Sequence, residues 1–203
     1  MAQESTTRVS VEFAVLNGNV ADADSDILVL KYAQAFHGAD QHVASILNKD
    51  GQVNPEEFRV LSGESVLLET RGAISPSHVL FLGVPELARL RYGHIYSIGQ
   101  RTVTSTMNLE CQRERISTTI HGVGVRLNEA AAFLAQLAGI LEALRTHRPS
   151  TLRSIAFVER DGDRFARLRL LFEERFRGDP HMRRSRTGGV YMFELSNSMG
   201  GTS

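Results

Sequence analysis

Residues 114–144 read ERISTTIHGVGVRLNEAAAFLAQLAGILEAL and indicate a strand, a glycine-containing loop and a long apolar helix, in that order. The segment Arg115 to Ile120 is rich in β-branched residues, which favour strands. Asn128 is a good N-cap, and nearly every residue from Ala130 to Leu144 is Ala, Leu, Ile or Phe. A helix that is apolar nearly all round is expected to be buried between layers, so Leu134→Asp is expected to unfold the protein.

The loop in this stretch predicts a ligand site. Glycines at 122 and 124 let backbone N–H groups approach an oxygen closely, and a helix beginning near Asn128 adds partial positive charge. A strand end, a glycine loop and a helix N-terminus together favour a phosphate or another anion. A tight turn that needs only glycine dihedral angles would give the same pattern. His121 could act on a bound anion or could simply be a packed side chain.

Outside this stretch, short apolar runs alternate with helical segments. Continuous apolar runs at Ile27–Leu30, His78–Val84 and Leu152–Val158 are typical of buried parallel strands. The other expected elements are strands at Arg8–Leu16, Ser65–Thr70 and Val190–Leu195 and helices at Gly38–Asn48, Tyr92–Leu109 and Asp163–Phe176. Residues 178–189 are expected to be irregular. This order predicts a mixed, mostly parallel sheet with helices on both faces, and ligands in such folds bind at the carboxyl ends of strands.

The composition excludes several classes of protein. The 203 residues carry 23 Lys plus Arg and 23 Asp plus Glu, so no overall field favours nucleic acid or an anionic membrane as a partner. The single cysteine, Cys111, rules out an intrachain disulfide. No apolar run is long enough to span a bilayer, and residues 1–10 lack a signal-peptide core. We expect a cytoplasmic protein with one domain over residues 1–195 and a flexible polar tail over residues 196–203.

Several short segments resemble a macro domain. Gly18-Asn19-Val20, the run that begins at Asp26 and Gly38-Ala39-Asp40 are similar to the start of that fold, and residues 118–124 resemble the loop that wraps the diphosphate of ADP-ribose. The resemblance implies a three-layer α/β/α mixed sheet and a site for ADP-ribose or a related nucleotide. The residues implied in binding are Gly18, Asn19, Val20, Gly38, Ala39, Asp40, Thr119, His121, Gly122, Val123 and Gly124.

The strand at Val11–Leu16 and the strand pair within Val66–Val84 are also similar to the N-terminal domain of leucine aminopeptidases. That domain is macro-like and lacks the metallopeptidase centre. In this resemblance the fold serves assembly, which implies a separately encoded protein partner.

Two departures from the macro-domain pattern bear on function. Asn19 stands where the family has an aspartate that contacts the adenine amine. Residues 30–33, Leu-Lys-Tyr-Ala, replace an asparagine-rich segment that serves catalysis in hydrolytic members. These departures imply a non-catalytic recognition module for a protein partner or an ADP-ribose-like ligand, acting as a regulatory subunit. An ADP-ribosyl hydrolase and an assembly domain of an aminopeptidase-like complex are the alternatives. Protein interaction would be favoured if the cleft were filled by side chains such as those of Tyr32, Phe36 and His37.

Other clusters have simpler explanations, and no catalytic residue, cofactor or metal is assigned. His37, Asp40 and His42 lack a regular ligand spacing, and Asp40 suits the first turn of a helix. The aspartates at 22, 24 and 26 are interpreted as a solvated turn rather than a calcium loop. The arginines at 183, 184 and 186 lack the interleaved aromatic residues of a nucleic-acid surface and are interpreted as a solvated loop.

Overall fold

The computed structural model describes residues 9–107, 109–111, 114–124, 127–185 and 189–195. The expected tail at 196–203 and Arg186 lie outside these residues. The elements are β1 (Val9–Asn17), the 3-10 helix η1 (Val20–Asp22), β2 (Ile27–Tyr32), α1 (Ala39–Lys49), β3 (Ser65–Glu69), β4 (His78–Gly83), the 3-10 helix η2 (Leu87–Arg89), α2 (Tyr92–Met107), β5 (Arg115–Thr118), α3 (Glu129–His147), β6 (Ser154–Glu159), α4 (Gly162–Phe176), β7 (Met182–Arg184) and β8 (Val190–Leu195).

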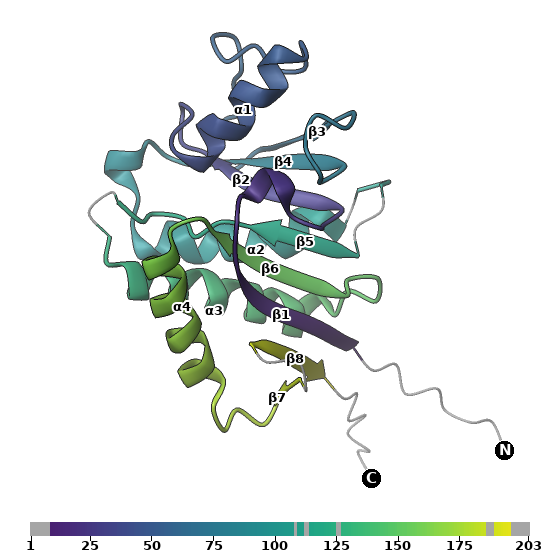
Figure 1. The fold of residues 1–203 in the computed structure, drawn as a ribbon, viewed down its shortest axis with the longest axis vertical. Coiled ribbons are helices and arrows are strands. Elements are labelled where there is room, and N and C mark those ends of the chain that lie inside the picture. The colour runs from purple at the N-terminus through teal and green to yellow at the C-terminus, as the bar shows by residue number, and fades with distance from the viewer. Residues whose placement is uncertain (1–8, 108, 112–113, 125–126, 186–188, 196–203) are drawn as a thin grey trace, which may run out of the picture.

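The described strands form one sheet in the order β3-β4-β2-β5-β6-β1-β8-β7 (Figure 1). β4, β2, β5, β6 and β1 run parallel to one another, while β3, β8 and β7 are antiparallel to their neighbours. The predicted mixed, mostly parallel sheet is therefore confirmed, and the strands expected at Ile27–Leu30, His78–Val84 and Leu152–Val158 all lie in it. Because parallel strands end at the same edge, the loops after β1, β2, β5 and β6 meet there.

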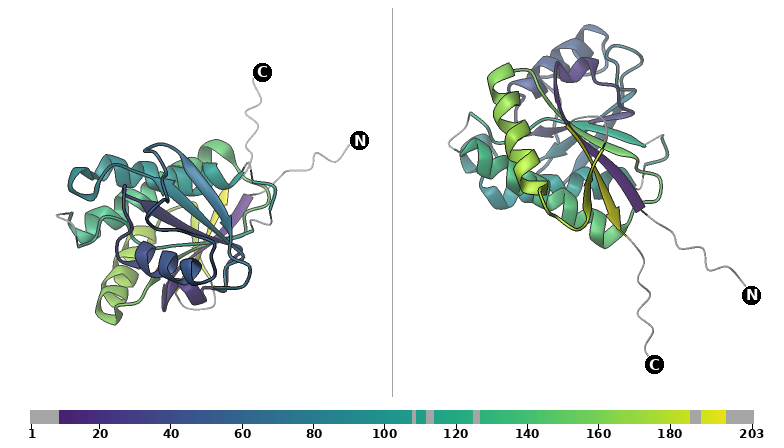
Figure 2. Two further views of the ribbon diagram at one scale, coloured as in Figure 1. Left: turned by 90° about the horizontal axis from the view of Figure 1, so that it is seen from above. Right: turned by 60° about the horizontal axis from the view of Figure 1, so that its bottom comes forward.

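Helices cover both faces of the sheet, which gives the predicted three-layer α/β/α architecture (Figures 1 and 2). Alternate residues of the buried strand β2 pack on opposite faces, as a strand's two-residue period requires. Ile27 and Val29 pack in the cluster that contains the apolar sides of α2, α3 and α4. Leu28 and Leu30 pack in a smaller cluster with α1.

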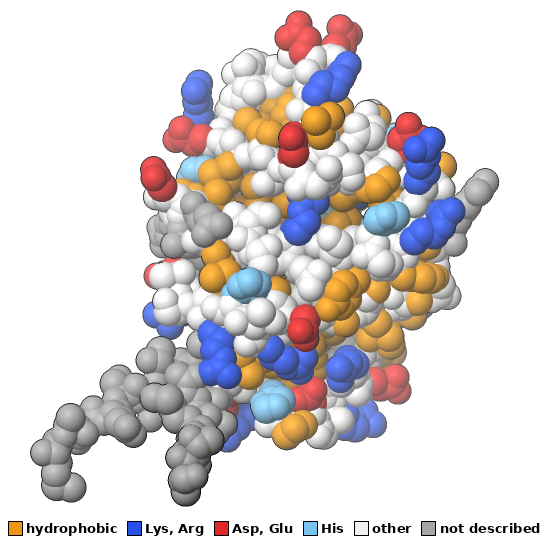
Figure 3. Space-filling model, turned by 180° about the vertical axis from the view of Figure 1, so that it is seen from behind, with side chains coloured by type: hydrophobic (Ala, Val, Ile, Leu, Met, Phe, Trp, Pro, Cys, Tyr) orange, Lys and Arg blue, Asp and Glu red, His pale blue; other side chains and the backbone are white. Residues whose placement is uncertain are grey.

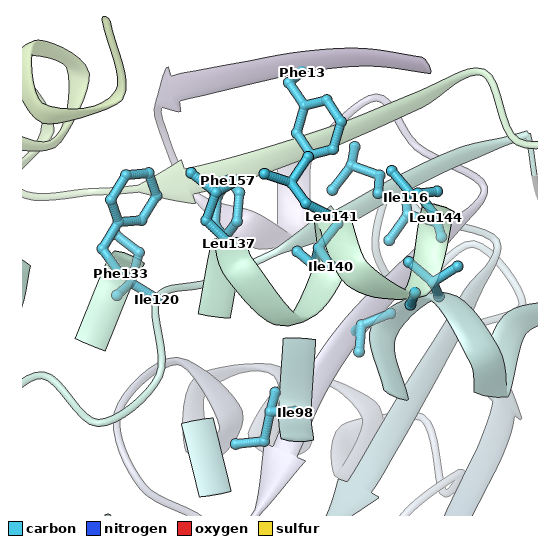
Figure 4. Packing of buried hydrophobic residues seen from close by; sticks show 14 of the residues in the cluster. Phe13, Ile98, Ile116, Ile120, Phe133, Leu137, Ile140, Leu141, Leu144 and Phe157 are labelled. Carbon is cyan, nitrogen blue, oxygen red and sulfur yellow. The ribbon is translucent and has the colours of Figure 1, made fainter. Parts of the chain in front are cut away.

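Helix α3 is the central support of the larger cluster. Asn128 caps it as predicted, with its side chain accepting a hydrogen bond from the backbone N–H of Ala131 at 3.0 Å. Phe133 meets Phe157 of β6 edge to face, with ring centroids 5.1 Å apart (Figure 4). The helix is less uniformly buried than its composition suggests. Leu134 is only partly buried, so we expect Leu134→Asp to destabilise the protein less than a charge at a fully buried position would.

Two glycines let α2 and α3 approach closely. A Cβ added at Gly99 of α2 would lie 2.1 Å from the carbonyl oxygen of Gln136, and one added at Gly139 of α3 would lie 2.0 Å from that of Tyr96. Backbone atoms cannot move aside as a flexible side chain can. The α2–α3 contact therefore requires glycine at both positions, and it fixes how α3 lies beneath the loop after β5.

Two local expectations were wrong. The segment 178–189 is not wholly irregular, because Met182–Arg184 forms β7 on β8. Asp26 is buried rather than solvated, and its carboxylate accepts hydrogen bonds from the backbone N–H groups of Glu114 and Arg115 at 2.9 and 2.8 Å. Asp26 thereby joins the start of β2 to the start of β5.

The face seen in Figure 3 carries Lys and Arg side chains interspersed with Asp and Glu side chains. No helix within the described residues is long and apolar enough to cross a membrane.

Candidate functional site

A cavity of about 450 Å³ lies at the carboxyl ends of β1, β2, β5 and β6. Its wall is built from the segments that follow these strands and from the first turns of α1 and α4. The residues that line it are Gly18, Asn19, Val20, Lys31, His37, Gly38, Ala39, Asp40, His42, Leu87, Thr119, Ile120, Gly122, Val123, Val158, Glu159, Arg160 and Arg164. Segments far apart in the sequence thus meet at one site because the parallel strands share an edge.

The structure brings together most of the residues that the sequence singled out. Gly18, Asn19 and Val20 line the cavity after β1, Gly38, Ala39 and Asp40 line it at the start of α1, and Thr119, Gly122 and Val123 line it after β5. His121 and Gly124 are not among the lining residues. The loops that begin at Gly38 and Thr119 face one cavity, which is the arrangement that the resemblance implied.

His121 is buried within the fold and does not face the cavity. It is 1% exposed, and its backbone N–H donates to the side-chain oxygen of Gln136 at 3.0 Å. Gln136 in turn donates to the carbonyl oxygen of Thr119 at 3.0 Å. Burial, together with the nearby charge of Lys31, holds the pKa of His121 well below its usual value, so the ring is neutral at pH 7. These contacts tie the loop after β5 to α3.

The first turns of α1 and α4 contribute residues to the cavity lining, and that of α3 does not. The first turn of α3 contributes no lining residue among those described, which corrects the expectation that Asn128 would place a helix dipole at this rim. Gly38, with φ of 60°, precedes α1 and has no side chain to cap it. The first N–H groups of a helix have no partner inside the helix, so α1 presents partial positive charge to the cavity.

Lys31 and Asp40 form a buried ion pair at this end of the cavity. The Lys31 ammonium donates to Oδ2 of Asp40, and the two side chains are 10% and 1% exposed. Burial raises the pKa of Asp40 to about 6, against the opposing effect of Lys31 and of a hydrogen bond from the backbone N–H of Asp40 itself. Burial, followed by the charge of Lys31, lowers the pKa of His37.

A second ion cluster lies where α4 begins. Arg164 donates to Glu129 of α3 at 3.0 Å and to Glu159 at 3.3 Å, and both Arg164 and Glu159 line the cavity. Arg167 donates twice to Glu129, at 2.9 and 3.0 Å, from outside the cavity. Arg160 is exposed and has no ion-pair partner among the described residues, so it adds a positive charge to the rim.

Aromatic side chains do not plug the cavity. Tyr32 and Phe36 pack against Phe58, with ring centroids 5.2 and 5.1 Å apart, on the α1 side of the sheet. Among the three residues that could have filled the cleft, only His37 lines it. The plugged cleft that would have favoured protein interaction over ligand binding is therefore not observed, because neither Tyr32 nor Phe36 lines the cavity.

Sequence reasoning missed the charged residues of the site. Lys31 was noted only as part of the replaced asparagine-rich segment. Asp40 was among the residues that the resemblance implied in binding, but its ion pair with Lys31 was not anticipated. A lysine inside a six-residue run that is otherwise apolar or aromatic is a signal that could have identified it, since a buried lysine needs a partner. Arg160 and Arg164 gave no such signal. Within the described residues, no three His, Cys, Asp or Glu side chains gather closely enough to hold a metal ion.

Comparison with known proteins identifies the fold. No family model matches the chain, and no curated protein matches it. Solved structures of macrodomains do match. The Trypanosoma brucei macrodomain in complex with ADP-ribose has a TM-score of 0.60 and 18% identity, over 80% of this chain and 68% of that one. In another crystal form of that macrodomain the match spans 65% of its chain. The chain thus spans about two thirds of the length of the Trypanosoma macrodomain.

A bacterial macrodomain is matched over its full length. The Oceanobacillus iheyensis macrodomain with MES bound has a TM-score of 0.62 and 11% identity, over 85% of this chain and 100% of that one. At such low identities the comparison shows the fold alone. The chain therefore has a macrodomain-like α/β/α fold, as the sequence resemblance implied.

Proposed function

We propose that this chain is a recognition module that binds ADP-ribose or a related adenine nucleotide. The observation that carries the proposal is a single cavity at the carboxyl ends of four parallel strands in a macrodomain-like fold. Structures of similar fold are those of a macrodomain in complex with ADP-ribose and with ADP. A volume of about 450 Å³ lies in the range of small-molecule sites.

The chemistry of the wall suits a nucleotide with a diphosphate. Gly122, with φ of 84°, and Val123 place backbone at the rim after β5, where N–H groups can reach phosphate oxygens. Arg160 and Arg164 provide positive charge beside the same rim. Asn19 lies in the segment after β1, where the resemblance implies the adenine. The side chain of Asn19 already accepts a hydrogen bond from the backbone N–H of Ala21 and donates one to the carboxylate of Asp22. We therefore expect a weaker adenine contact than an aspartate would make.

The module is proposed to be non-catalytic. Two carboxylates, Asp40 and Glu159, are present in the described lining, and each is held in an ion pair, with Lys31 and Arg164 respectively. A general base must have an oxygen within hydrogen-bond reach of the attacking water, and each of these carboxylates already accepts a hydrogen bond from a cationic side chain. Release of free ADP-ribose from an ADP-ribosylated protein would contradict this part of the proposal and favour the hydrolase alternative.

Calorimetry with ADP-ribose and a bulky substitution test the site. Gly18 lines the cavity, its φ is not positive and an added Cβ would meet nothing within 4 Å, so Gly18→Phe should fold and obstruct the cavity. Gly93 is also free of neighbours within 4 Å but lies on the exposed start of α2. We expect Gly18→Phe to abolish binding and Gly93→Phe to bind normally. Gly122→Glu is a poorer choice because the added Cβ would lie 2.7 Å from Leu127.

A second candidate function, recognition of a protein partner, is favoured by an uncovered part of the sheet. On β1 the inward residues Val11 and Phe13 are fully buried, whereas Glu12 and Leu16 on the other face are exposed, Leu16 to 45%. Figure 1 shows no helix over this part of β1. A regulatory subunit, or an assembly domain like that of leucine aminopeptidases, would use such a face. The test is the native mass of the protein purified from its own cells, with Leu16→Asp as the variant expected to lose a bound partner.

A further inference from the structure

Lys31 brings a charged group to the floor of the cavity. It is the fifth residue of the buried strand β2, and only 10% of its side chain is exposed. An ammonium group has three N–H donors, and Asp40 is its one hydrogen-bond partner among the described residues. Because Lys31 lines the cavity, its remaining donors can serve a ligand.

The charge of Lys31 acts on both histidines near it. Burial first, and the charge of Lys31 second, lower the pKa of His37, which precedes α1, and of His121, which follows β5. The lining carboxylates are Asp40, which faces Lys31, and Glu159, which is engaged by Arg164 at 3.3 Å. His42, on the first turns of α1, is the remaining titratable group at this end of the lining. No further acid in the described lining competes for the ammonium group.

The N-terminus of α1 adds to the same region. Gly38, Ala39 and Asp40 all line the cavity, and Gly38 leaves the helix without a side-chain cap. The partial positive charge of this 11-residue helix therefore acts beside Lys31. An anion placed here would meet an ammonium group and a helix N-terminus at once, whereas a neutral hydroxyl group would gain little from either.

We propose that Lys31 determines specificity and selects a ligand that places a phosphate group against Lys31 and the first turn of α1. The preferred ligand is a nucleotide that ends in phosphate, such as a nucleoside diphosphate, over one that ends in a neutral sugar, such as ADP-ribose. This inference rests on the proposed function, because it assigns a ligand preference to the same cavity.

Calorimetry with ADP and ADP-ribose measures the preference without any substitution. We expect ADP to bind about tenfold more tightly than ADP-ribose, as one additional charge-assisted contact would give. Equal affinities, or tighter binding of ADP-ribose, would overturn the inference and leave the proposed function intact. Binding of neither nucleotide would overturn both. Binding of inorganic pyrophosphate alone would retain the anion site and overturn the nucleotide proposal.

Substitution then assigns the preference to Lys31. The double variant Lys31→Gln/Asp40→Asn replaces the ion pair by two amides and leaves no unpaired buried charge, so it is more apt to fold than either single variant. We expect it to bind ADP and ADP-ribose with affinities within about twofold of each other. Lys49→Gln, on the exposed last turn of α1, is the matched control and should keep the wild-type preference. A preference that survives in the double variant would overturn the role of Lys31.

A spectroscopic measurement covers the case in which the double variant does not fold. Lys31 and Lys49 are the two lysines of the chain, so a protein labelled with ¹³C at lysine Cε gives two side-chain signals. We expect ADP to shift the signal of Lys31, which Lys49→Gln identifies by elimination, and to leave that of Lys49 in place. An unchanged Lys31 signal at saturating ADP would contradict direct contact with the phosphate.

Discussion

Two ion clusters line the same cavity in very different surroundings. Lys31 and Asp40 have side chains that are 10% and 1% exposed, whereas Arg164 and its partner Glu129 are 33% and 23% exposed. Arg167, the outer member of the second cluster, is 59% exposed. In the buried pair desolvation is large enough to raise the pKa of Asp40. In the outer cluster the hydrogen bond from Arg167 is the largest influence, and it lowers the pKa of Glu129.

The contribution of an ion pair to stability therefore depends on how far its members are removed from water. Breaking a buried pair leaves a desolvated charge, which typically costs about 3–5 kcal/mol, while exposed pairs contribute about 0–1 kcal/mol. We therefore expect the Lys31–Asp40 pair to have the larger effect on stability and to determine ligand preference. The outer cluster is expected to affect stability little and to act through the charge of Arg164 at the rim of the cavity.

The largest effect is expected from removing one member of the buried pair. Lys31→Met should lower the free energy of unfolding by about 3–5 kcal/mol, because Asp40 loses its partner. Lys31→Met/Asp40→Leu, which removes both charges, should stay within about 2 kcal/mol of the wild type. Urea denaturation at pH 7 measures both values. Equal losses in the two variants would show that packing, and not charge, dominates at this position.

The next effect is a pH dependence that comes from Asp40. Its pKa rises from 3.8 in the unfolded chain to about 6 in the fold, so the folded state binds the proton more tightly. The resulting stabilisation is fully present below pH 3.8 and is lost as the pH rises through about 6. At 1.36 kcal/mol per pKa unit the loss is about 3 kcal/mol.

The comparison that isolates Asp40 is the wild type against Asp40→Asn. Denaturation curves from pH 4 to 7 should show the wild type losing stability relative to the variant as the pH rises. Because His121 is present in both proteins, its own titration largely cancels in the difference. A difference that is independent of pH would exclude the raised pKa of Asp40.

A smaller effect is expected in the outer cluster. Arg164→Gln should lower the free energy of unfolding by about 1 kcal/mol or less, because the guanidinium group is a third exposed and Glu129 keeps Arg167 as a partner. Since Arg164 lines the cavity, the same substitution should weaken ADP binding by about tenfold. Calorimetry and urea denaturation of one preparation give both values. Unchanged affinity would place the phosphates away from α4.

The smallest effect is expected at Arg167, the matched control for Arg164. Arg167 shares Glu129 with Arg164 but does not line the cavity. Arg167→Gln should change the free energy of unfolding by less than about 0.5 kcal/mol and leave ADP affinity within about twofold of the wild type. If Arg167→Gln weakened binding as strongly as Arg164→Gln, the effect at Arg164 would be one of overall charge and not of contact.

The sequence by itself determined the elements and their class. Continuous apolar runs such as Ile27–Leu30 became buried parallel strands, and Asn128 capped the long helix, because these features depend on side-chain period and local hydrogen bonding. The same local chemistry placed glycine at 38 and 122, where the observed φ values are 60° and 84°. Most of the implied site residues met at one cavity because parallel strands must end at a shared edge.

The tertiary structure alone decided which charges are buried and which helices line the cavity. Lys31 and Asp40 are nine positions apart on a strand and a helix, so no periodicity links them, and their pairing depends on how α1 docks beside β2. Only the packed structure shows that Leu134 of α3 is partly buried. It also shows that the first turns of α1 and α4, and not that of α3, line the cavity. Burial and long-range electrostatics are properties of the assembled layers, which a linear pattern of residues does not contain.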